Sequence, residues 1–100
     1  METSLLIDNT PRSAVGGETF ARRHPTDDRL ITTIAAATVA DARAAADSAS
    51  RAFAAWSRTG PTERRRILLR AADLVEEKVG EFVSTMALEV GASELWSRFN

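Results

Sequence analysis

The sequence predicts an α/β fold in which short strands come first and amphipathic helices follow. Residues 1–37 are rich in turn formers and contain one run, residues 30–34, dominated by the β-branched side chains that favour strands. From residue 38 onward apolar residues recur every three to four positions, which is the period of an amphipathic helix. We therefore expect strands and turns over residues 1–37 and helices over residues 38–100.

Two or three short strands are expected in the first part, and the candidate segments are residues 5–7, 19–23 and 30–34. The turns are expected at residues 8–11, at Gly16 and Gly17, and at residues 26–29. The second strand should end at His24, because the residue before a proline, here Pro25, avoids helical geometry. We expect a small antiparallel meander, which is stable only when it packs on something else.

The helices carry recognisable start and stop signals. Thr38 and Asp41 have the spacing of a capping box, in which each side chain bonds a free backbone N–H of the first turn. Pro61 suits the first turn of a second helix, where its missing N–H costs nothing. Gly80 is expected to kink or end that helix, and Gly91 to cap the C-terminus of a third segment.

Each helix presents an apolar face. The stripe of the second helix consists of Ile67, Leu68, Ala71, Leu74, Val75 and Val79. Three such segments and a small meander expose more apolar surface than they can bury against one another. A fourth helix starts near Ser93 and runs to Asn100 with no cap or turn residue after it. We therefore expect a truncated segment of a larger fold.

Composition excludes several function classes. The chain has no cysteine, so it offers no thiolate nucleophile, disulfide or cysteine-ligated metal. A formal net charge of -1 gives no reason to expect nucleic acid or an anionic membrane as a partner. No run is long enough for a signal peptide or a membrane span, so the expected location is the cytoplasm.

Each residue that could carry a catalytic or binding role is better explained by a structural role. The single histidine, His24, stands beside a proline in a turn and has no partner set for a metal or a catalytic triad. The five glycines form no GxGxxG or P-loop pattern. The arginine run at residues 64–66 lies among acidic residues without interleaved aromatics, as on a solvated helix face. Trp56 and Trp96 fit core or interface positions better than a ligand pocket. We predict no catalytic, cofactor-binding or metal-binding residue in this chain.

The order of several motifs suggests a family. They are residues 17–20 (Gly-Glu-Thr-Phe), His24-Pro25, residues 35–41, residues 52–57 (Ala-Phe-Ala-Ala-Trp-Ser) and residues 60–74. In this order they resemble the N-terminal portion of the NAD(P)-dependent aldehyde dehydrogenase superfamily, over nearly the whole chain from Leu5 onward. The run from residue 52 to residue 74 is the most specific part. His24-Pro25 and the tail from Glu89 to Asn100 resemble the salicylaldehyde dehydrogenase type, which oxidises aromatic aldehydes.

The resemblance implies a parent enzyme that works through a cysteine thioester, with hydride transfer to NAD or NADP and a glutamate that activates water. It implies that these groups, an asparagine at the oxyanion and the cofactor-binding residues lie beyond residue 100. Some members hold a structural alkali cation near the positions of Arg22, Arg23 and Glu89, but we assign no metal here. The family also implies that residues 1–100 are an incomplete part of a dinucleotide-binding domain, with the rest of the fold as partner and a dimeric or tetrameric parent. The chain alone should bind no cofactor and be inactive.

A second hypothesis belongs to another class. The alanine-rich and aromatic helix faces would also suit a stand-alone small helical protein that oligomerises or binds a partner without catalysis.

Overall fold

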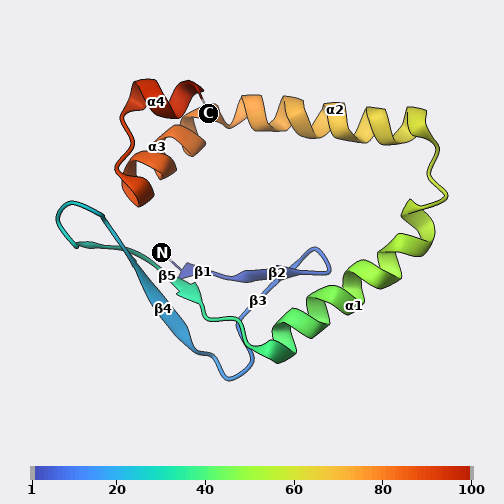
Figure 1. Ribbon diagram of the computed structural model, residues 1–100, viewed down its shortest axis with the longest axis horizontal. Coiled ribbons are helices and arrows are strands. Elements are labelled where there is room, and N and C mark those ends of the chain that lie inside the picture. Colours follow the sequence, from blue (N-terminus) through green and yellow to red (C-terminus); the bar gives the residue numbers. More distant parts are fainter. Residues whose placement is uncertain (1, 100) are drawn as a thin grey trace. The chain divides into compact units, whose positions relative to one another are not determined.

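The computed structural model describes residues 2–99 and contains five strands followed by four helices (Figure 1). The strands are β1 (Glu2–Thr3), β2 (Leu5–Ile7), β3 (Thr10–Arg12), β4 (Thr19–Arg23) and β5 (Leu30–Ala35). The helices are α1 (Val39–Trp56), α2 (Pro61–Glu77), α3 (Val79–Val90) and α4 (Glu94–Phe99). The prediction of short strands followed by helices is confirmed.

The strands form two sheets, where the sequence suggested one antiparallel meander. β4 and β5 pair antiparallel, as expected, but β1 pairs with β5 in parallel to complete a three-stranded sheet. β2 and β3 form a separate antiparallel hairpin. The prediction of a single antiparallel meander is wrong because β1, only two residues long, pairs in parallel with a strand about thirty residues further along the chain. No local sequence pattern indicates this pairing.

The β2–β3 hairpin has a tighter turn than expected. Only Asp8 and Asn9 separate the paired residues Ile7 and Thr10, and both have positive φ angles, 56° and 54°. A two-residue type I′ turn requires this left-handed geometry, which aspartate and asparagine tolerate better than most residues. Pro11, expected in the turn, therefore lies in β3, at the edge position that a proline can occupy.

The helices begin and end where the sequence predicted, with one exception. Thr38 and Asp41 form the expected capping box, Pro61 is the first residue of α2, and Gly91 caps α3 with a φ of 67°. The break between α2 and α3 falls at Lys78, two residues before Gly80. Gly80 itself continues the new helix.

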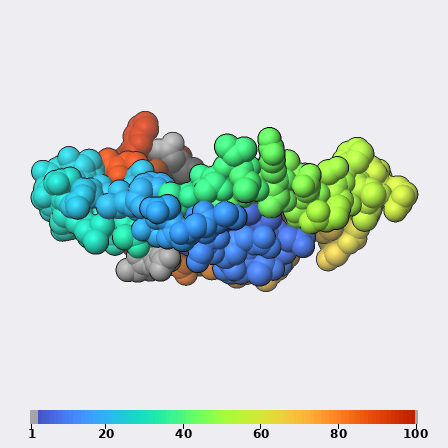
Figure 2. Space-filling model, turned by 90° about the horizontal axis from the view of Figure 1, so that it is seen from below, coloured from blue at the N-terminus to red at the C-terminus, as the bar shows by residue number. Residues whose placement is uncertain are grey.

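The chain divides into two compact units. The first comprises residues 1–23 and 29–58, and contains both sheets and α1. In it, the hairpin lies against α1, where Figure 2 shows the blue hairpin beside the green helix. The second comprises residues 24–28 and 59–100, where α3 packs on α4. Among the described residues, only four apolar side chains are buried: Ile7, Ala14, Ala35 and Val83.

Candidate functional site

The carboxylate of Asp41 accepts several hydrogen bonds in the first unit. Its side chain is only 4% exposed. It accepts hydrogen bonds from the Thr38 backbone N–H and hydroxyl, each at 2.8 Å, and from the Val15 N–H at 3.1 and 3.2 Å to its two oxygens. These bonds, the one from the Thr38 N–H first, hold the pKa of Asp41 below its usual range. The carboxylate therefore joins the loop before β4 to the start of α1.

The hydrogen bonds of Asp41 have a structural role. Both oxygens of Asp41 accept hydrogen bonds and its pKa is lowered, so it is poorly suited to act as a base. The capping box was visible in the sequence. The bond to Val15 was not, because it joins residues 26 positions apart through a loop of irregular geometry.

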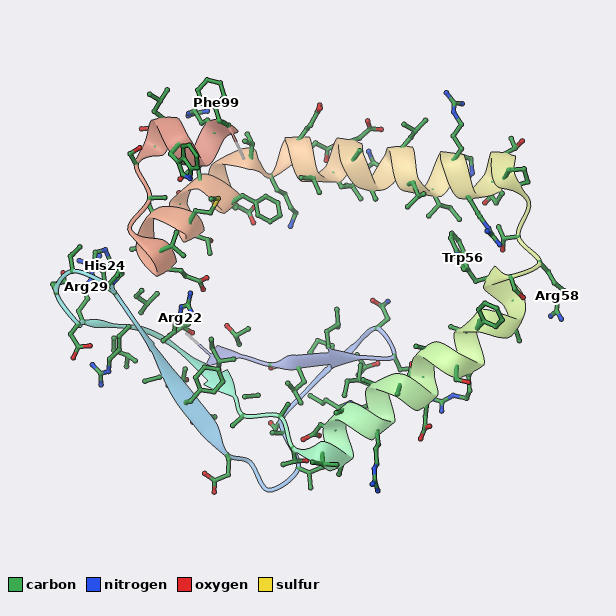
Figure 3. All side chains as sticks on the ribbon, in the orientation of Figure 1. Arg22, His24, Arg29, Trp56, Arg58 and Phe99 are labelled. Atoms are coloured by element: carbon green, nitrogen blue, oxygen red, sulfur yellow. The ribbon has the colours of Figure 1, made fainter. Side chains whose placement is uncertain are left out.

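His24 is occupied within its own turn. Its Nδ1 lies 3.0 Å from the Thr26 hydroxyl and 3.3 Å from an Asp27 carboxylate oxygen. Figure 3 shows its side chain at the loop between β4 and β5. The imidazole thus organises residues 24–28, which agrees with the interpretation of His24 as a turn residue.

The arginines of α2 form ion pairs on the helix surface. Arg66 contacts Glu63 at 2.6 Å, and Arg70 contacts Glu77 at 3.2 Å. The hydrogen bond from Arg66 lowers the pKa of Glu63. These exposed pairs match the solvated, salt-bridged helix face inferred from the charge pattern.

The positions associated with a cation in some family members fall in both units. Arg22 and Arg23 flank an irregularity in the β4–β5 register, in the first unit. Glu89 lies half-buried near the end of α3, in the second. Among residues 3–99, whose side chains the structure describes, no three histidine, aspartate or glutamate side chains come together as a metal site. No residue is assigned to a cation.

The glycines do not build a phosphate cradle. Gly16 and Gly17 lie in a turn, Gly60 is the N-cap of α2, and Gly91 caps α3. None of them links a strand to the start of a helix, as dinucleotide-binding glycines do. These glycines therefore do not form a dinucleotide-binding loop of that kind.

Many large apolar side chains of the described residues are exposed. In the second unit the apolar faces of the helices stand open: Leu95 is 70% exposed and Phe99 81%, and Figure 3 shows the Phe99 ring projecting away from α4. Trp96 and Trp56 are also exposed, as interface residues would be in a chain without its partner. An apolar groove of about 620 Å³ is lined by residues of all three helices of this unit: Val75, Glu76, Val79, Phe82, Met86, Ser97 and Arg98.

Comparison with known proteins assigns the family. A model described as the aldehyde dehydrogenase family matches residues 12–99. The chain belongs to the aldehyde dehydrogenase family. It is 47% identical over 100 residues to salicylaldehyde dehydrogenase of Pseudomonas putida, and 42% identical over 100 residues to vanillin dehydrogenase of Pseudomonas fluorescens. All of this chain is covered in both cases, but only 21% and 20% of those dehydrogenases.

Solved structures agree with this assignment. A salicylaldehyde dehydrogenase from Pseudomonas putida G7, complexed with salicylaldehyde, superposes with a TM-score of 0.96 and 46% identity, over 99% of this chain and 20% of that one. A structure of PnpE with nicotinamide adenine dinucleotide gives a TM-score of 0.93 at 43% identity, over 98% of this chain and 20% of PnpE. This aldehyde dehydrogenase chain therefore spans about a fifth of the length of its relatives. No helix in the described part has the length and apolar character needed to cross a membrane.

Proposed function

We propose that this chain is the N-terminal part of an aldehyde dehydrogenase that oxidises an aromatic aldehyde, such as salicylaldehyde, to the carboxylic acid. The enzyme would use NAD or NADP and a cysteine thioester, with the cofactor-binding residues and the cysteine in the rest of its chain. Residues 1–100 would form an incomplete part of the dinucleotide-binding domain and be inactive alone.

The observation that carries this proposal is the 47% identity to salicylaldehyde dehydrogenase over all 100 residues. An identity of 47% over 100 residues is too extensive to be confined to the few buried positions, so it includes surface positions, which favours a shared setting over a shared local fold. The chain contains no cysteine, so a thioester mechanism needs a nucleophile from elsewhere.

The open apolar surface supports the same proposal. Soluble monomers rarely leave large contiguous apolar patches in water, because covering such a surface is favourable by roughly 25 cal/mol per Å². Among the described residues of the second unit, only Val83 is a buried apolar residue. In the parent enzyme, the remainder of the dehydrogenase fold would pack on this apolar surface. The parent enzyme would be a homo-oligomer in the cytoplasm.

The test is a chimeric enzyme. In the Pseudomonas putida salicylaldehyde dehydrogenase, the segment aligned with this chain is replaced by residues 1–100. The chimera is assayed for NADH formation with salicylaldehyde, beside the 100-residue chain alone and the dehydrogenase lacking the segment. We expect activity only in the chimera. Measurable NAD reduction by the 100-residue chain would refute its inactivity, and a folded but inactive chimera would refute the proposed role.

A further inference from the structure

We draw no further inference here: the strongest candidate, the apolar groove formed by α2, α3 and α4 in the second unit and lined by Val75, Val79, Phe82 and Met86, is an unpartnered helix face, and nothing in the structure shows what covers it.

Discussion

Gly91 offers the sharpest test of the packing in the second unit. It ends α3 with a φ of 67°, and its N–H donates to the Ala87 carbonyl at 3.1 Å. A β-carbon added there would lie 3.1 Å from the Cγ atom of Pro25, in the turn at residues 24–28. Gly91→Ala should therefore meet two costs at once, a left-handed backbone and a tight contact.

The magnitude follows from those two costs. A left-handed conformation costs an L-residue roughly 1–2 kcal/mol. The reduced entropy of the unfolded chain returns about 0.4–1 kcal/mol. Displacing Pro25 by a few tenths of an ångström adds to the cost, so we expect a net loss of about 1–2 kcal/mol.

Gly80→Ala is the matched control. Gly80 lies within α3, and an added β-carbon would meet nothing within 4 Å. Alanine should therefore stabilise by about 0.4–1 kcal/mol. Urea unfolding of the chimeric enzyme, followed by its residual dehydrogenase activity, gives both midpoints. The midpoint should fall for Gly91→Ala and rise or stay for Gly80→Ala. If Gly91→Ala were as stable as Gly80→Ala, the description of the α3 cap would be incorrect.

The effects of three further substitutions on the urea midpoint of the chimera are measured by the same titration. Thr38→Ala removes the N-cap of α1 and should cost about 1 kcal/mol; an unchanged midpoint would contradict the capping box. The lowered pKa of Asp41 means that its contribution to stability is present above the ordinary aspartate pKa and is lost as the pH falls through the folded value. The midpoints of wild type and Asp41→Asn should therefore differ at neutral pH and converge below about pH 4, and a constant gap would refute the carboxylate's role. Val83→Ala removes methyl groups from a side chain only 8% exposed and should cost roughly 1–3 kcal/mol, whereas a neutral effect would show that this core is loosely packed.

Local signals account for the parts of the fold that the sequence predicted. Thr38 and Asp41 are three residues apart, and Gly91 follows directly on the helix that it caps, so chemistry within one or two turns decides both ends. The same holds for the His24 side chain, whose contacts to Thr26 and Asp27 lie within three residues.

Non-local pairing accounts for the rest. The parallel contact of β1 with β5 and the bond from Val15 to Asp41 depend on chain segments meeting across many residues, which local propensity does not encode. The break at Lys78 shows the limit of a local rule, because glycine within a helix is tolerated when nothing else stops it. For the site, the sequence predicted apolar faces without a partner, and the structure shows them open, as at Phe99.

The coding sequence that follows the Asn100 codon tests the central proposal most directly. If the chain is part of an aldehyde dehydrogenase, that sequence, in frame or after a frameshift, should encode a Rossmann segment followed by the catalytic cysteine and glutamate. A downstream sequence that encodes neither in any frame would contradict the proposal and favour the stand-alone helical protein.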